Sequence, residues 1–232
     1  MSERRIYLAT SALAAENFDA YRTIEEASKH GFYGVQLYIN PDFYQPDYTT
    51  SLNTALRDKQ LSLIVHLPNL PNKTDIKVTS ELAEHVPDSL ALVHYQPLTQ
   101  LPQIRGITIG WENSVNAPEI DHVVEVREHV KKDETFFVFD YGRLMITDQE
   151  ETKRQIRHFI ETVLFQLRPK KDVIHLADKT CWDKKFRQCP CAFGQGVVSE
   201  FLPQVKDFVT RGGRVVFEDE NLQMAIDGLR SF

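Results

Sequence analysis

Residues 135–140 read Thr-Phe-Phe-Val-Phe-Asp, a run with almost no polar alternation that ends in an acid. Such a run is typical of a strand buried on both faces, as in a parallel sheet that helices cover. Further runs of the same kind occur along the chain at Arg5–Ala9, Gly34–Ile39, Leu61–His66, Leu90–Tyr95, Gly106–Glu112, Asp172–Ala177 and Arg214–Glu218. The sequence therefore predicts eight buried strands.

Stretches with helical periodicity separate these strands. We expect helices over residues 17–30, 47–60, 74–85, 116–131, 199–211 and 221–229, and one behind Thr147 and Glu150, which have capping-box spacing. The connection Thr99–Gln103 is too short for a normal helix. Eight βα units predict a single (β/α)₈ barrel over residues 1–232. The alternative is an open doubly wound sheet, which usually has a glycine-rich loop after its first strand, whereas residues 9–12 read Ala-Thr-Ser-Ala.

The composition is that of a globular protein with a mild acidic excess. The chain has 27 Lys+Arg against 33 Asp+Glu, a formal charge of −6, which does not steer it broadly toward nucleic acid or an anionic membrane. Its sequence contains no apolar run near the roughly 20 residues that span a bilayer, and its first residues do not resemble a signal peptide. Three cysteines, Cys181, Cys189 and Cys191, do not make a disulfide framework, so we expect a cytoplasmic protein.

Six consecutive strands carry a His, Asp or Glu at or near the carboxyl end, in the order His66, His94, Glu112, Asp140, His175 and Glu218. In a barrel these ends converge on one mouth, where catalytic residues gather. Three carboxylates in a semi-buried mouth repel one another and lose hydration, and a divalent cation removes that cost. We therefore expect one Mn, Co, Zn or Mg ion with mixed nitrogen and oxygen ligands.

Each of these residues also has an ordinary explanation. A single buried histidine is more often satisfied by hydrogen bonds than bound to a metal, and Asp140 alone could cap a helix. The other histidines fall on predicted helices, and we expect them at the surface: His30, His85, His122, His129 and His158.

The order His, His, Glu-Asn, Asp, His, Glu on strands three to eight, with Gly31-Phe32-Tyr33-Gly34-Val35 at the second strand, resembles the xylose isomerase-like barrel superfamily. That group includes sugar and sugar-phosphate isomerases and epimerases, and the AP endonuclease family 2. The resemblance implies a primary metal site formed by Glu112, Asp140, His175 and Glu218. It also implies that His66 and His94 contact substrate, or hold a second metal with Glu112 bridging as in the endonucleases.

The same resemblance implies a reaction on a small sugar or sugar-phosphate. Glu112 and Glu218 would move a proton at the carbon beside a carbonyl, from opposite faces, while the metal stabilises the enediolate. Glu220 takes the role of Glu218 if the predicted register of the last strand is off by two. The sequence leaves open which sugar is bound, whether it is phosphorylated, and whether the chain forms a homo-oligomer.

Two residues depart from the family pattern. Gln36 ends the second strand where the family usually has Glu; an amide can bind a substrate hydroxyl but accepts protons poorly. Arg143 stands three residues after Asp140, where the family often has His, and a guanidinium suits a phosphate or carboxylate of the substrate. These departures leave open a second alternative, a barrel that binds a sugar-like ligand without catalysis. The endonuclease alternative lacks its Asp-x-His metal pair, because residues 188–190 read Gln-Cys-Pro, and this argues against cleavage at abasic sites.

The loop after the seventh strand is rich in lysine and contains Gly194-Gln195-Gly196. A Gly-x-Gly before a helix can present N–H groups to an anion, and barrels often bind phosphate in this region. We therefore expect Lys179, with Lys184 or Lys185 nearby, to contact the substrate; the alternative is a solvated basic loop. The cysteine spacing is not that of a zinc finger, so free thiols are expected.

Overall fold

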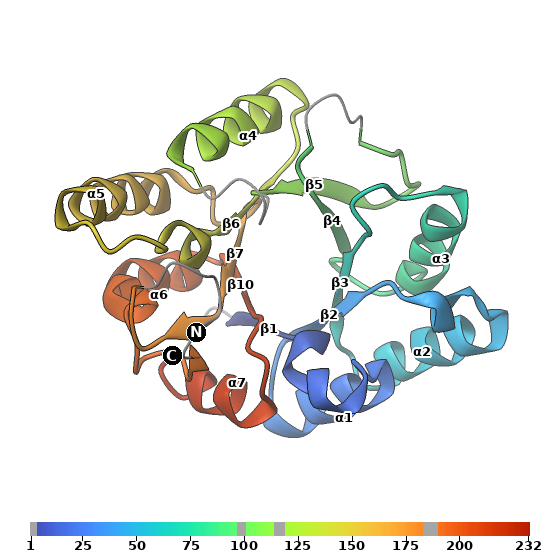
Figure 1. The fold of residues 1–232 in the computed structure, drawn as a ribbon. Helices are drawn as coiled ribbons and strands as arrows, with labels where there is room; N and C mark the ends of the chain where they lie inside the picture. Colours follow the sequence, from blue (N-terminus) through green and yellow to red (C-terminus); the bar gives the residue numbers. More distant parts are fainter. Residues whose placement is uncertain (1–3, 97–100, 114–118, 183–189) are drawn as a thin grey trace.

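The computed structural model describes residues 4–96, 101–113, 119–182 and 190–232. Eight parallel strands close into a barrel in the order β1-β10-β7-β6-β5-β4-β3-β2, and helices surround it (Figure 1). The barrel strands are β1 Arg5–Ala9, β2 Gly34–Tyr38, β3 Ser62–His66, β4 Leu90–His94, β5 Thr108–Glu112, β6 Phe137–Asp140, β7 Val173–Leu176 and β10 Arg214–Phe217. The predicted (β/α)₈ barrel is confirmed, with every strand end within two residues of its predicted position.

Helices follow the strands around the ring in Figure 1. In the described ranges they are α1 Ala20–His30, α2 Pro46–Asp58, α3 Lys73–Ala83, α4 Ile120–Lys132, α5 Glu150–Gln166, α6 Leu202–Thr210 and α7 Leu222–Leu229. The described part of the β4–β5 connection, residues 101–107, contains no helix, in agreement with its short length. The predicted start of α4 at Asn116 lies outside the described residues. Among the described helices, none has both the length and the hydropathy needed to cross a membrane.

The helix α1 begins three residues later than predicted. Asn17 and Phe18 have φ angles of 56° and 57°, in the left-handed region, which a right-handed helix of L-residues does not contain. The helix starts only after Asp19, whose side chain accepts a hydrogen bond from the Arg22 amide. Two successive left-handed residues thus separate the 3₁₀ turn Thr10–Glu16 from α1.

The predicted capping box before α5 is wrong. Thr147 Oγ1 accepts a hydrogen bond from the Gln149 amide at 3.2 Å, and the helix begins at Glu150 behind Gln149, which gives no side-chain cap. The backbone at Gln149 is still extended, so Thr147 lies too far upstream to be the cap. The last helix keeps its predicted start, because Asn221 accepts hydrogen bonds from the amides of Gln223 and Met224.

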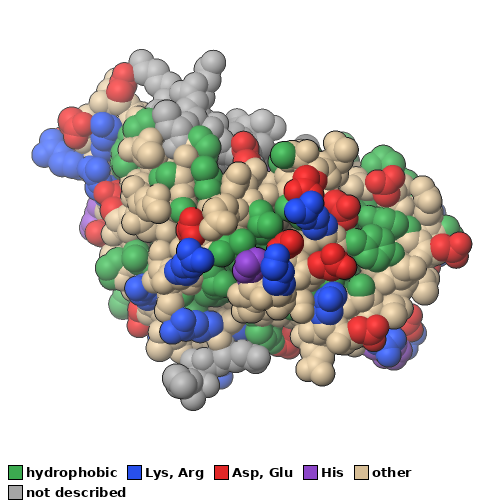
Figure 2. Space-filling model, turned by 90° about the horizontal axis from the view of Figure 1, so that it is seen from below, with side chains coloured by type: hydrophobic (Ala, Val, Ile, Leu, Met, Phe, Trp, Pro, Cys, Tyr) green, Lys and Arg blue, Asp and Glu red, His purple; other side chains and the backbone are tan. Residues whose placement is uncertain are grey.

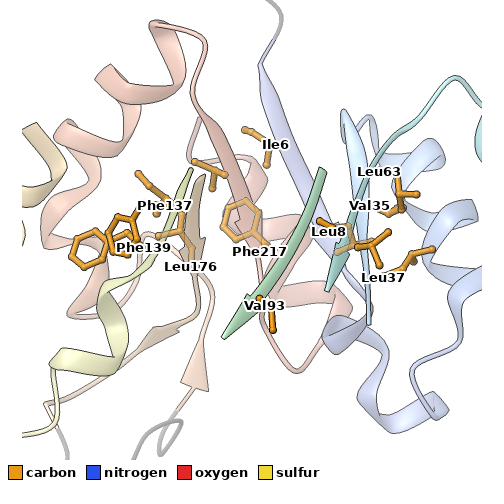
Figure 3. Close-up of a cluster of buried hydrophobic side chains, with 14 of the residues drawn as sticks. Ile6, Leu8, Val35, Leu37, Leu63, Val93, Phe137, Phe139, Leu176 and Phe217 are labelled. Carbon is orange, nitrogen blue, oxygen red and sulfur yellow. The ribbon is translucent and has the colours of Figure 1, made fainter. Parts of the chain in front are cut away.

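The outward-facing residues of the strands pack against the helices, as Figure 3 shows for Phe137, Phe139, Leu176 and Phe217. Burying each such side chain contributes roughly 1.5–3 kcal/mol relative to leaving it exposed. Since neighbouring residues of a strand point to opposite faces, these positions leave the alternate ones pointing into the barrel. Leu176 and Phe217 therefore direct their neighbours His175 and Glu218 inward.

Below the mouth, the barrel interior is a packed core. Two aromatic rings, of Tyr7 and Phe136, lie among aliphatic side chains there. Both need glycine on the neighbouring strand: a Cβ on Gly34 would lie 2.7 Å from the Tyr7 ring, and one on Gly110 would lie 2.3 Å from the Phe136 ring. The interior is thus filled, and polar groups are gathered at the carboxyl end.

Candidate active site at the barrel mouth

Alternate residues of each strand point into the barrel, and this brings six His, Asp and Glu side chains to its carboxyl end. In the sheet register His94 lies beside Glu112, and Asp140 lies beside His175. Glu218 follows the last residue of β10 directly and is buried, whereas Glu220 is exposed, so the predicted register of this strand is confirmed. The five other histidines, on the helices or directly after α3, are exposed or half-buried as predicted.

Glu112 is the centre of this cluster and is fully buried. Its Oε2 lies 3.2 Å from His66 Nε2 and 3.4 Å from His94 Nε2. Its Oε1 lies 3.0 Å from Arg143 Nη2 and 3.2 Å from His175 Nδ1. Burial alone would raise the pKa of Glu112, but His175 and Arg143 outweigh it and hold this pKa well below its usual value. Glu112 is therefore a carboxylate at neutral pH.

The hydrogen bonds of His66 and His94 fix which ring nitrogen carries the proton. Nδ1 of His66 lies 3.0 Å from the Leu67 carbonyl oxygen, and Nδ1 of His94 lies 2.7 Å from Asn69 Oδ1. Both partners are acceptors, so each Nδ1 donates, and Nε2 of each ring is the atom turned toward Glu112 Oε2, where it could ligate an ion through its lone pair. Two acceptor atoms that face one another repel, and a proton or a cation between them would remove this repulsion.

His175 and Glu218 form the other side of the cluster. His175 Nδ1 lies 3.3 Å from Glu218 Oε1, which also accepts a 2.7 Å hydrogen bond from Gln36 Nε2. Burial alone would lower the pKa of His175, but the carboxylates of Glu218 and Glu112 outweigh it and raise this pKa to about 10. Without a metal ion, a proton on His175 balances part of the negative charge of Glu112 and Glu218.

Asp140 is held by groups other than the histidines. Arg143 Nε donates to Asp140 Oδ2, and the Asn113 side chain bonds reciprocally with the Asp140 backbone, donating to its carbonyl and accepting from its amide at 2.9 Å each. Burial is the largest influence on Asp140 and raises its pKa, with further increases from Glu218 and Glu112. Two carboxylates of one mouth, Glu112 and Asp140, therefore have pKa values shifted in opposite directions.

A cavity of about 390 Å³ opens above the cluster on the side of β1 and β2. It is lined by Ala9, Thr10, Ser11, Phe18, Gln36, Tyr38, Asn40, His66, His94, Arg143 and Glu218. Four of the five residues predicted to bind substrate are thus part of its wall. Phe18 and Tyr38 form an aromatic rim, each 47% exposed. This volume lies within the range of small-molecule sites.

Lys179, the fifth predicted substrate contact, does not line this cavity. Its side chain is buried, and Nζ donates to the Met145 carbonyl oxygen at 2.7 Å. Lys184 and Lys185 lie outside the described residues. The position of Lys179 favours a structural role, in which it ties the loop after β7 to the segment before α5.

The glycine pair after β7 binds an anion that belongs to the protein itself. The carboxylate of Asp178 accepts hydrogen bonds from the amides of Gly194, Gly196 and Val198 at 3.2, 3.0 and 2.8 Å. A Cβ on Gly196 would lie 2.2 Å from the Lys179 carbonyl oxygen, so only glycine fits there. The N–H groups predicted to hold a phosphate are therefore used by Asp178, in the turn that follows the short ribbon β8 Asp178–Lys179 and β9 Pro190–Cys191.

The donor set of the mouth fits a divalent cation. Ligand atoms of Glu112, His175 and Glu218 lie within 4.8 Å of one another, and so do those of Glu112, His66 and His94. Several of the buried atoms have no hydrogen-bond partner in the described part of the chain: Glu112 Oε2, His94 Nε2, His175 Nε2 and Asp140 Oδ1. Buried polar atoms without partners are costly, and a cation would satisfy those of Glu112 and of the two histidines, which belong to the two groups. Asp140, predicted as a fourth ligand, belongs to neither group.

Solved structures share this architecture at low sequence identity. The probable 3-DHS dehydratase AsbF from Bacillus anthracis, involved in petrobactin synthesis, is 14% identical, with a TM-score of 0.66 over 97% of each chain. AsfvAP, solved as AsfvAP:AG, is 10% identical, with a TM-score of 0.62 over 98% of this chain and 97% of its own. A xylose isomerase domain protein from Planctomyces limnophilus is 13% identical, with a TM-score of 0.57 over 97% and 93% of the two chains.

A D-allulose 3-epimerase from Methylomonas sp., solved in complex with D-allulose, is 13% identical, with a TM-score of 0.53 over 92% of this chain and 83% of its own. No protein-family model and no curated protein sequence matches the chain. The fold is that of the xylose isomerase-like TIM barrels. The resemblance inferred from the strand-end residues is confirmed at the level of the fold.

Sequence reasoning missed several residues of the site. Asn69, which orients His94, lies in a loop after β3 whose pattern gives no sign of a contact with β4. Phe18 reaches the cavity because the backbone is left-handed at this point, and a phenylalanine at such an angle has no sequence signal. Asn113 does have a signal, since it follows Glu112 directly in the Glu-Asn pair of the fifth strand.

The surface agrees with a small ligand better than with a polyanion. On the face shown in Figure 2, acidic and basic side chains are interspersed, and no broad basic band crosses it. Together with the formal charge of −6, this gives little electrostatic support for nucleic acid on that face.

Proposed function

We propose that this barrel is a metal-dependent isomerase or epimerase of a small sugar or sugar-phosphate. The observation that carries the proposal is the buried group Glu112, His175 and Glu218 beside a cavity walled by Gln36 and His66. Epimerase and dehydratase barrels among the structural neighbours support it, and one of them binds the sugar D-allulose.

Glu112, His175 and Glu218 would hold the ion. When bound, a divalent cation would polarise a sugar carbonyl and stabilise negative charge on its oxygen. His66 and His94, which line the cavity, would bind hydroxyl groups and orient the sugar, and Gln36 would keep Glu218 in place through its 2.7 Å hydrogen bond.

Glu218 is the carboxylate that we assign to proton removal. It lines the cavity, so a substrate carbon can approach it, whereas Glu112 is not part of the cavity wall. Glu112 is also engaged by four side chains and has a pKa well below its usual value, which makes it a weak base. Isomerisation needs one group that moves a proton between neighbouring carbons; epimerisation would also use Glu112 as the second member of the pair.

The test is proton exchange at carbon. The protein is incubated with Mn²⁺ in D₂O with D-allulose and a panel of other ketoses, aldoses and their phosphates, and deuterium on carbon is followed by NMR. Exchange is expected for the wild type and is lost in Glu218→Gln. Glu220→Gln is the matched control, because Glu220 lies two residues away and is exposed, and it should exchange as the wild type does. Exchange that survives in Glu218→Gln contradicts the assignment.

A second candidate function, that of a metal-dependent phosphodiesterase, is supported by the second group of ligand atoms. The group His66, His94 and Glu112 could hold a further ion that shares Glu112, as in the metal-dependent phosphodiesterase alternative. Two ions per chain and cleavage of an abasic duplex would favour the phosphodiesterase. Metal binding without exchange on any sugar of the panel would favour a barrel that binds a sugar-like ligand without catalysis.

The cytoplasm remains our proposal for the location of the protein. Cys191 is a free thiol, as expected in a reducing compartment. Cys189 lies outside the described residues.

A further inference from the structure

Arg143 is placed between two of the carboxylates predicted to bind the metal. Its Nε donates to Asp140 Oδ2, and its Nη2 lies 3.0 Å from Glu112 Oε1. All three side chains are buried, with residue exposures of 4%, 2% and 0% for Arg143, Asp140 and Glu112. A buried planar guanidinium with two bonded edges is a fixed group, unlike a flexible lysine.

This placement changes which atoms can reach an ion. Arg143 bonds only the Oδ2 atom of Asp140, and Oδ1 has no hydrogen-bond partner in the described part of the chain, but this ion pair fixes the carboxylate, and Asp140 is absent from both ligand groups of the described chain. The ligand atoms of Glu112, His175 and Glu218, two carboxylate oxygens and an imidazole nitrogen, remain close enough together to share one ion.

Arg143 also changes the net charge of the barrel mouth. Glu112, Asp140 and Glu218 carry three negative charges when ionised, and Arg143 reduces the total to two. A divalent ion with a neutral His175 then makes the cluster neutral, whereas without Arg143 the same cluster would keep one negative charge. The site with Arg143 therefore attracts a cation less strongly.

We propose that Arg143 is a positioning residue that withholds Asp140 from the metal, so that the ion has three protein ligands and one more coordination position for substrate or water. This inference rests on the proposed cation site of Glu112, His175 and Glu218. Three protein ligands with an open position are typical of catalytic metal sites, and four protein ligands are typical of closed ones. Arg143 would thus keep the ion accessible.

The experiment is a Mn²⁺ titration of the full chain, with free Mn²⁺ measured by EPR. Arg143→Ala should release Asp140 and bind Mn²⁺ at least tenfold more tightly than the wild type, since one more carboxylate becomes available. Adding Asp140→Asn to Arg143→Ala should abolish that gain. Arg211→Ala removes an exposed arginine that directly follows α6, and it should leave the affinity for Mn²⁺ unchanged.

A second measurement covers the case in which Arg143→Ala does not fold without metal. In the wild-type background, Asp140→Asn should change the Mn²⁺ affinity less than threefold, whereas Glu218→Gln should lower it tenfold or more. Equal losses in the two variants would overturn the proposal, and so would an Arg143→Ala variant that binds Mn²⁺ no more tightly than the wild type. These readouts need no substrate, so a protein that exchanges no sugar proton can still confirm or refute the role of Arg143.

Discussion

The opposite pKa shifts of Glu112 and Asp140 predict that neutralising Glu112 destabilises the fold much more than neutralising Asp140. Glu112→Gln keeps the shape of the side chain but removes a charge that His175 and Arg143 stabilise. Removing one partner from a buried ion pair costs about 3–5 kcal/mol, because the other charge is left uncompensated. In a chain of this length each 1 kcal/mol shifts Tm by roughly 2–4 °C, so Glu112→Gln should lower Tm by roughly 6–20 °C.

Asp140→Asn should cost much less, about 1 kcal/mol or below. Burial raises the pKa of Asp140, which means that its charged form is less stable in the folded than in the unfolded protein. The asparagine oxygen can still accept the hydrogen bond from Arg143, and Arg143 keeps Glu112 as its anion.

The assay is urea unfolding at pH 7 in EDTA for the wild type, Glu112→Gln and Asp140→Asn. Glu128→Gln, on the exposed face of α4, is the control and should not move the midpoint. The folded pKa of Glu112 lies below its unfolded value, so its contribution is present above pH 4.5 and is lost as the pH falls below it. Equal destabilisation by the two variants, or a Glu112→Gln protein as stable as the wild type, would refute the electrostatic reasoning.

Three further predictions concern the packing, the thiols and the rim of the cavity. Gly110→Ala should destabilise the fold by about 1–3 kcal/mol in urea, because the new Cβ would lie 2.3 Å from the Phe136 ring, and Phe136→Leu should restore part of the loss. Burial raises the pKa of Cys191 to about 12, so at pH 8 its alkylation, followed by peptide mass spectrometry, should be about 10³ times slower in the folded than in the unfolded chain and should rise with pH. Phe18→Ala and Tyr38→Ala should each weaken binding of a sugar substrate by about 3–10-fold in calorimetry, since an aromatic contact contributes about 0.5–1.5 kcal/mol, whereas Phe165→Ala, at an exposed position on α5, should leave it unchanged.

The strands could be predicted closely, and the beginnings of two helices, α1 and α5, could not. A strand buried on both faces has a strong signal, because every residue of a run such as Phe136–Phe139 is apolar. The start of α1 depends on two left-handed residues, Asn17 and Phe18, of which only asparagine is common at such angles, and the start of α5 depends on an extended Gln149. Such backbone angles are set by packing around the loop and leave little trace in local sequence.

For the site, the sequence by itself determined which residue types meet: alternation along each strand fixes the inward face, and the closed barrel carries His66, His94, Glu112, Asp140, His175 and Glu218 to one end. Only the tertiary structure decided how these groups divide among partners. Arg143, three residues beyond Asp140, had to be folded back over β5 and β6 before its two ion pairs existed, and Asp178 had to meet the glycine turn before that turn lost its free amides. A periodic pattern depends on the chain alone, whereas a choice between competing charged partners depends on distances that exist only in the folded barrel.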